Sequence, residues 1–184
     1  SGILTCSIRP SGIWGRGDQT MFRKMFEQVI AGRVKVLVGS KHAKLDNSYV
    51  HNLIHGFILA AQHLVPQLRG PLLIVGAGVQ GQSHLEAFAA CWDLQEVWIC
   101  SRSQHSAQRL ATLARSLGLT ARVVTDANAA MARCPLVVTC TPATEVVLRV
   151  PPRDDSFVAA VGAFTPRMQE IGPALCRHFA ELGT

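Results

Sequence analysis

The sequence lacks several patterns that mark particular classes of protein. Its six cysteines form no C-x-x-C pair, and the simplest account is free, buried thiols in a reducing compartment. No apolar run reaches the roughly 18 residues that a membrane-spanning helix needs. The first 20 residues do not show the charged-then-apolar order of a signal peptide. We therefore expect a cytoplasmic protein without a membrane partner.

Long runs of like charge are also missing. The formal net charge is +6, and the basic excess lies mostly in the first 45 residues, where only Asp18 and Glu27 are acidic. No basic run is interleaved with aromatic residues, so we expect no nucleic-acid partner. His51 and His55 have a helical spacing that can bind metal, but no third ligand stands out nearby, and we expect no metal site.

The organisation of the chain changes near residue 70. Before it, helices are predicted over 21–31 and 49–64 and a strand over 34–38, with loops over 1–20 and 41–48. Pro66 and Gly70 interrupt the pattern, and we divide the chain into residues 1–66 and 67–184.

After residue 70, strands and helices alternate. The predicted strands cover 72–75, 96–100, 121–125, 136–140 and 157–161, and the predicted helices cover 80–91, 105–117 and 128–132. This order implies an α/β fold of the Rossmann type, a doubly wound and mostly parallel sheet with helices on both faces. The irregular N-terminal segment stands apart as an incomplete or divergent addition.

A glycine-rich turn follows the first strand of this region. Gly76, Gly78 and Gly81 form G-x-G-x-x-G between a buried strand and a helix, the context that makes the motif specific. Gly76 permits the tight turn, Gly78 allows close approach to a pyrophosphate, and Gly81 allows helix and strand to pack closely. The free N–H groups of the helix start, at Val79 and Gln80, favour an anion. We predict a dinucleotide site here.

The residues after the second strand bear on the choice of dinucleotide. An NAD site has an acidic residue there to bind the ribose 2′-hydroxyl, whereas this chain has Ser101, Arg102 and Ser103. Arg102 can pair with a 2′-phosphate and the serines can donate hydrogen bonds to it. NADP(H) is favoured over NAD(H), and the alternative is that Arg102 is a solvated loop residue.

Three further residues are expected at the carboxyl edge of the sheet, where ligands bind in open α/β folds. Thr141 ends the fourth strand, although Thr-Pro is also an ordinary strand exit, and Val161 and Gly162 end the fifth. These residues would border the nicotinamide. His84 lies close to the glycine turn, and we interpret it as a histidine on the helix surface.

Three stretches resemble the ornithine cyclodeaminase/mu-crystallin family: 75–88 (VGAGVQGQSHLEAF), 139–144 (TCTPAT) and 160–171 (AVGAFTPRMQEI). The VGAFTP form is most similar to its ketimine reductase branch. The resemblance implies NAD(P)H-dependent reduction of a cyclic imino acid, Δ1-pyrroline-2-carboxylate to L-proline or Δ1-piperideine-2-carboxylate to L-pipecolate. Glu170 matches a family acid near the site, with a local cap or bridge as its alternative role.

The chain departs from this family in two places. Ornithine cyclodeaminases have an aspartate where this chain has Phe164, which favours the reductase over the cyclodeaminase. The family's Arg-Thr-Ala-Ala sequence is replaced by 52–55, and its lysine segment is not recognisable in 30–50. Residues 1–66 are therefore interpreted as a remnant of the substrate and dimerisation domain, and the family's final strand is expected beyond Thr184.

Three functions stay open at this point. The first is the ketimine reductase, and the second is the cyclodeaminase that converts L-ornithine to L-proline and ammonia. The third is an NADPH-binding protein without catalysis, similar to mu-crystallin. No catalytic residue is assigned, because the substrate-binding region does not align, and the family's homodimer stays an open expectation for the same reason.

Overall fold

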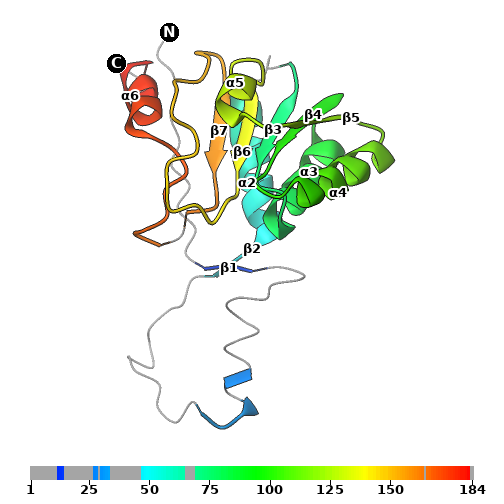
Figure 1. Ribbon diagram of the computed structural model, residues 1–184, viewed down its shortest axis with the longest axis vertical. Coiled ribbons are helices and arrows are strands. Elements are labelled where there is room, and N and C mark those ends of the chain that lie inside the picture. The colour runs from blue at the N-terminus through cyan, green and yellow to red at the C-terminus, as the bar shows by residue number, and fades with distance from the viewer. Residues whose placement is uncertain are drawn as a thin grey trace.

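A five-stranded parallel sheet forms the centre of the structure (Figure 1). The computed structural model describes residues 12–14, 27–28, 30–33, 47–64, 69–163 and 165–182. The strands of the sheet are β3 (Leu72–Val75), β4 (Glu96–Cys100), β5 (Thr120–Val124), β6 (Leu136–Thr139) and β7 (Phe157–Ala160). Their order is β5-β4-β3-β6-β7, and each neighbouring pair is parallel. The chain thus builds outward from β3 in both directions, which confirms the predicted doubly wound α/β fold.

Helices cover both faces of this sheet (Figure 1). They are α2 (Val50–Leu64), α3 (Val79–Cys91), α4 (Gln104–Ser116), α5 (Ala127–Met131) and α6 (Pro173–Leu182). The first three share one apolar core, and the last two contribute to a second core on the opposite face. In the part of the chain that is described, no helix combines the length and hydropathy needed to cross a membrane.

Alternation along the strands explains how one sheet supplies both cores. In β3, Leu72 and Ile74 pack into the core under α2, α3 and α4, whereas Leu73 and Val75 pack into the core under α5 and α6. Neighbouring side chains of a strand point to opposite faces, so a strand between two helical layers must be apolar throughout. This is why the four-residue apolar runs of β3 and β6 are buried at every position.

Helix α2 belongs to the same core as the sheet. Its buried residues Leu53, Phe57 and Ala61 recur at helical spacing, as predicted, and the helix packs on α3. The stretch before residue 66 therefore contributes directly to the packing of the α/β unit. The predicted boundary between residues 66 and 67 stays a prediction.

Other expectations for the N-terminal region were wrong or lie outside the described residues. The short strand β1 (Gly12–Trp14) pairs in parallel with β2 (Asn47–Tyr49), where loops were expected. Strands of three residues are too short to show a recognisable alternation. The predicted strand 34–38 lies outside the described residues, as does most of the predicted helix 21–31. Helix α6 was not predicted, although Pro173 is well suited to a first helical position.

Candidate functional site

The carboxyl edge of the sheet brings the predicted site residues together. The strand register pairs Val75 with both Cys100 and Thr139, and pairs Thr139 with Ala160. The residues that follow these strands therefore lie side by side along one edge. They include the glycine turn, the Ser101–Ser103 segment, Thr141 and the Val161–Gly162 segment. Sequence reasoning placed all four groups at this edge.

The backbone of the glycine turn requires glycine at two positions. Gly76 has φ +112°, and a Cβ there would lie 2.6 Å from the carbonyl oxygen of Cys140. A Cβ at Gly81 would collide with the carbonyl oxygen of Gly76, because the first turn of α3 lies against the end of β3. The amide of Gly76 donates to the carbonyl of Cys100 at 2.8 Å, which ties the turn to the neighbouring strand. Both glycines thus serve close packing.

Gly78 differs from its two neighbours in the motif. A Cβ built at Gly78 meets no heavy atom within 4 Å, so the space in front of it is open. Gly78 is also the N-cap of α3, and within the described residues no side chain caps this helix or places an acid in its first turn. Free N–H groups and the positive end of the helix dipole therefore face open space. The amides of Val79 and Gln80 lie at this helix start, which fits a pyrophosphate.

Three buried side-chain atoms near the turn have no hydrogen-bond partner among the described residues: Gln80 Oε1, His84 Nε2 and Thr139 Oγ1, of which Gln80 belongs to the turn itself. Gln80 Oε1 is shielded from solvent and accepts no hydrogen bond from any residue that the structure describes. Burying an unpaired polar atom has a cost, and such atoms often mark a place where a ligand or water binds. This observation adds to the open space at Gly78.

The serines after β4 have structural roles in the turn itself. Ser103 is the N-cap of α4, and its Oγ accepts from the amide of Ser106 at 3.2 Å. Ser101 Oγ accepts from the amide of Ser103 at 3.3 Å. Arg102 between them is exposed, and among the described residues it forms no ion pair. The serine hydroxyl protons and the Arg102 guanidinium remain available to a ligand, as the predicted role requires.

Glu170 joins the segments that follow β6 and β7, a role that sequence reasoning left open. The residue is 1% exposed, and its carboxylate accepts four hydrogen bonds. Oε1 accepts from the amide of Thr141 at 2.6 Å and from its hydroxyl at 2.9 Å. Oε2 accepts from the amides of Gly162 at 2.6 Å and Ala163 at 3.2 Å. Glu170 therefore bridges two neighbouring parts of the sheet edge.

Gly162 is constrained by the same contact. A Cβ at this position would collide with the backbone of Thr141 and lie 2.5 Å from Glu170 Oε1. The close approach of the two segments thus explains the glycine without any ligand. Thr141 and Gly162 lie where they were predicted, but the Thr141 hydroxyl is already engaged as a donor to Glu170.

Cys140 connects the same edge to the glycine turn. Its thiol donates to the carbonyl oxygen of Gly76, with an Sγ to oxygen distance of 3.2 Å. Burial, and secondarily the nearby Glu170 carboxylate, hold the pKa of this thiol well above its usual range. The thiol stays protonated at neutral pH, so it acts as a packing group and hydrogen-bond donor and is unsuited to nucleophilic chemistry.

The interpretation of His84 as a surface histidine was wrong. His84 is completely buried, its Nδ1 lies 2.8 Å from the carbonyl oxygen of Gln80, and its ring centroid lies 6.2 Å from that of Phe57. Burial lowers the pKa of His84 to about 4, against a smaller raising effect of the Gln80 carbonyl. The ring is therefore neutral at pH 7 and forms part of the α2–α3 contact.

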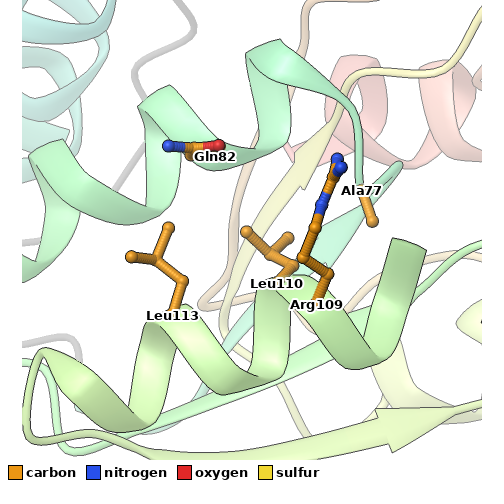
Figure 2. Close-up of a pocket in the computed structure, with 5 residues that line it drawn as sticks. All are labelled: Ala77, Gln82, Arg109, Leu110 and Leu113. Carbon is orange, nitrogen blue, oxygen red and sulfur yellow. The ribbon is translucent and has the colours of Figure 1, made fainter. Parts of the chain in front are cut away.

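A cavity of about 220 Å³ opens between α3 and α4. It is lined by Ala77, Gln82, Arg109, Leu110 and Leu113, and Figure 2 shows the Arg109 side chain directed toward the turn that carries Ala77. Ala77 is the second residue of the glycine turn, so the cavity adjoins the predicted dinucleotide site. Sequence reasoning did not identify Arg109.

Two family models match different parts of the chain. Residues 58–180 match the ornithine cyclodeaminase/mu-crystallin family, and residues 1–84 match the 3-beta hydroxysteroid dehydrogenase/isomerase family. The 3-beta-hydroxysteroid dehydrogenase of Mycolicibacterium neoaurum is 88% identical over 65 residues, which are 35% of this chain and 18% of that protein. The Δ(1)-pyrroline-2-carboxylate reductase of Bacillus cereus is 30% identical over 136 residues, 72% of this chain and 42% of that reductase. The chain thus spans less than half the length of either relative.

Solved structures support the fold. The Thermococcus litoralis Δ(1)-pyrroline-2-carboxylate reductase, solved with NADH and L-proline, matches with a TM-score of 0.62 at 21% identity, covering 67% of this chain and 38% of that one. An archaeal alanine dehydrogenase dimer with bound NAD matches with a TM-score of 0.60 at 22% identity, covering 73% of this chain and 44% of that one. At such identities the likeness concerns the fold, which is the Rossmann-like architecture described above. Because one family model matches well over half of the chain, across the whole sheet and its edge, the chain belongs to the ornithine cyclodeaminase/mu-crystallin family.

Proposed function

We propose that residues 67–184 bind NADP(H) and that the protein reduces cyclic imino acids, converting Δ1-pyrroline-2-carboxylate to L-proline and Δ1-piperideine-2-carboxylate to L-pipecolate. The observation that carries this proposal is the open, uncapped start of α3 at Gly78, within a chain of this family. The pyrroline-2-carboxylate reductases among its relatives and structural neighbours support cyclic imino acids as the substrate class. The free thiols of the described cysteines support a reducing, cytoplasmic location.

The proposed roles follow from the positions of the residues. Gly78, Val79 and Gln80 hold the pyrophosphate at the helix start. Ser101, Arg102 and Ser103 hold the adenosine end, where the Arg102 guanidinium pairs with a 2′-phosphate. Thr141, Val161 and Gly162 border the nicotinamide, and Glu170 keeps Thr141 and Gly162 in register.

The bound nicotinamide would supply a hydride from its C4 atom to the carbon of the protonated imine, whose nitrogen takes up the electron pair of the C=N double bond. The contribution of the described residues is to orient the ring at the sheet edge and to keep the two edge segments rigid. The position of Phe164, which favoured the reductase over the ornithine cyclodeaminase, lies outside the described residues. The cyclodeaminase reaction is therefore distinguished from the reductase reaction by its products, because it forms L-proline and ammonia from L-ornithine.

A second candidate is an NADPH-binding protein without catalysis. The observation that favours it is the match of residues 1–84 to a different family model, over the region where the resemblance implies a substrate domain. Cofactor binding and substrate binding depend on different stretches of this chain. The first can therefore be retained without the second.

The test is to measure NADPH binding and NADPH oxidation with the purified chain. The reductase proposal predicts binding in calorimetry and oxidation of NADPH on addition of Δ1-pyrroline-2-carboxylate. Tight binding without oxidation would support the second candidate, and no binding of either dinucleotide would exclude both. Ammonia release from L-ornithine would favour the cyclodeaminase.

A pair of glycine variants tests the binding site itself. Gly78→Ala places a methyl group in open space, so the fold should tolerate it while the pyrophosphate is obstructed. We expect the affinity for NADPH and for NADH to fall by about tenfold or more, with only a small decrease in Tm because alanine is a poorer N-cap than glycine. Gly56→Ala in α2 is the matched control, since its Cβ also meets nothing within 4 Å. Equal affinities of the two variants would contradict the assigned role of Gly78.

A further inference from the structure

The rim of α4 that faces α3 carries a cation beside the glycine turn. Arg109 lies about one and a half turns into α4, and it lines the cavity together with Leu110 and Leu113. Ala77 and Gln82 form the opposite wall. The cavity thus connects the adenosine side of the predicted site with the space between the two helices.

The Arg109 side chain is directed toward the carboxyl edge of the sheet, where the glycine turn lies. Side chains of a helix lean toward its N-terminus, and α4 begins directly after the Ser101–Ser103 segment. Figure 2 shows the guanidinium raised from α4 toward the strand-to-helix turn at Ala77. Arg102 precedes α4 and Arg109 projects back from its second turn, so the two cations approach the same end of the helix.

The charge of Arg109 is uncompensated within the described part of the chain. Arg109 is exposed and forms no ion pair or hydrogen bond there. The cavity lining contains no acid, and the first turns of α3 and α4 contain none either. Gln82 is engaged elsewhere, since its Nε2 donates to Glu86 Oε1 at 2.9 Å. An anion bound in this cavity could therefore pair with the guanidinium of Arg109.

One carboxylate does lie near this edge. Asp126 follows β5 and is the N-cap of α5, where its Oδ1 accepts from the amides of Asn128 and Ala129. Helix α5 packs on the opposite face of the sheet from α4. Asp126 is thus already hydrogen-bonded on the other face, and it leaves the α3–α4 side positively charged.

We propose that Arg109 is a second specificity-determining residue, which binds the 2′-phosphate of NADP(H) together with Arg102. This inference rests on the proposed NADP(H) site. A phosphate monoester carries a charge of about −1.5 to −2 at pH 7, so one guanidinium compensates it incompletely. Two guanidinium groups, that of Arg102 before α4 and that of Arg109 within α4, together compensate the charge of the phosphate and donate hydrogen bonds to its oxygens.

The experiment compares four nucleotides with three variants by calorimetry: NADPH, NADH, 2′,5′-ADP and 5′-AMP. For Arg109→Gln we expect the affinity for NADPH and for 2′,5′-ADP to fall about tenfold, and the affinity for NADH and 5′-AMP to change less than about twofold. Arg109→Lys, which keeps the charge, should recover part of the loss. Arg115→Gln is the control for net charge, because it removes the same charge from the last turn of the same helix; its Tm is measured as well, since Arg115 Nη2 also donates to the carbonyl oxygen of Ala121 at 3.1 Å.

The outcomes separate this inference from the proposed function. If the unmodified chain binds neither NADPH nor NADH, the proposed function itself fails. If the unmodified chain binds NADPH but Arg109→Gln lowers NADPH and NADH affinity equally, or lowers neither, Arg109 does not contact the 2′-phosphate and the inference is overturned. A loss of NADPH affinity as large in Arg115→Gln as in Arg109→Gln would overturn it as well, since net charge alone would then explain the effect.

Discussion

Replacing Glu170 with glutamine should weaken the sheet edge more than any surface substitution. The carboxylate oxygens accept from the amides of Thr141 and Gly162 at 2.6 Å each and from Ala163 at 3.2 Å. An amide offers one acceptor oxygen, so its NH₂ group must face donors on one of the two segments. If the oxygen stays with Thr141, the amides of Gly162 and Ala163 lose their acceptor and face another donor.

The magnitude follows from the number of hydrogen bonds lost. A buried donor left without a partner costs about 1–3 kcal/mol, and two such amides bring the expected loss of unfolding free energy to about 4 kcal/mol. For a chain of this length, that loss corresponds to a Tm lower by roughly 8–16 °C. Thr141 and Gly162 would also lose their fixed positions, so the affinity for NADPH should decrease in the same variant.

Thermal and urea denaturation followed by circular dichroism measure this effect. Glu145→Gln is the control, because Glu145 is an exposed carboxylate in the connection between β6 and β7, which also contains Thr141, the partner of Glu170. Its Tm should equal that of the unmodified chain, since surface substitutions change stability by about 0.5 kcal/mol or less. A Glu170→Gln variant whose Tm and NADPH affinity match those of Glu145→Gln would refute the structural role derived from the four hydrogen bonds.

Two further predictions concern pH and cofactor choice. Burial lowers the pKa of His84 from 6.5 to about 4. Between these pH values the unfolded chain binds a proton at His84 and the folded chain does not. Stability is full above pH 6.5 and should fall by up to about 3 kcal/mol as the pH decreases toward 4. His84→Leu should remove that part of the pH profile, and an unchanged slope would contradict the assignment. Arg102→Ala should reduce NADPH affinity by about tenfold or more while sparing NADH, and equal losses would show that Arg102 does not bind a 2′-phosphate.

The strands and the glycine turn could be predicted because their signals are local. The run Leu72–Val75 is apolar throughout, as a strand between two helical layers must be, and the turn follows it directly. The site edge then followed from the rule that parallel strands end at a common edge. Thr141, Val161 and Gly162 were therefore placed correctly from sequence, although what binds beside them stays a prediction.

The parts that were missed depend on contacts between distant residues. The role of Glu170 was left open, because it bonds Thr141 across 29 residues and three of its four donors are backbone amides, which leave no mark in the sequence. His84 was assigned to the surface because its nearness to the glycine turn was weak evidence for a role and the family resemblance assigned it none. In the structure α2 packs on α3, so that Phe57 lies over the histidine ring. The packing of α2 on α3 therefore determines that His84 is buried.

Helix α2 also shows how two family matches can coexist in one folded unit. The 3-beta hydroxysteroid dehydrogenase/isomerase model covers residues 1–84 and the ornithine cyclodeaminase/mu-crystallin model covers residues 58–180, so the second match begins in the middle of α2 and contains the whole five-stranded sheet. Even so, Leu53, Ile54 and Phe57 complete the core over α3. A helix that has an apolar stripe of the right spacing can fill that position. Packing alone therefore does not require that the helix and the sheet match the same family model.

The same division bears on chemistry. The Ser101–Ser103 segment, Thr141, Gly162 and Glu170 lie only within the match over residues 58–180, whereas the glycine turn lies in residues 58–84, where the two matches overlap. The substrate-gripping residues that the resemblance implies belong upstream, where the other model matches. Cofactor affinity and imine reduction should therefore respond to different variants: changes at Gly78 or Arg102 alter binding, whereas turnover requires that the N-terminal segment supply a substrate site of its own. A chain that binds NADPH tightly and leaves Δ1-pyrroline-2-carboxylate unreduced would support the NADPH-binding protein without catalysis and would leave the proposed dinucleotide site standing.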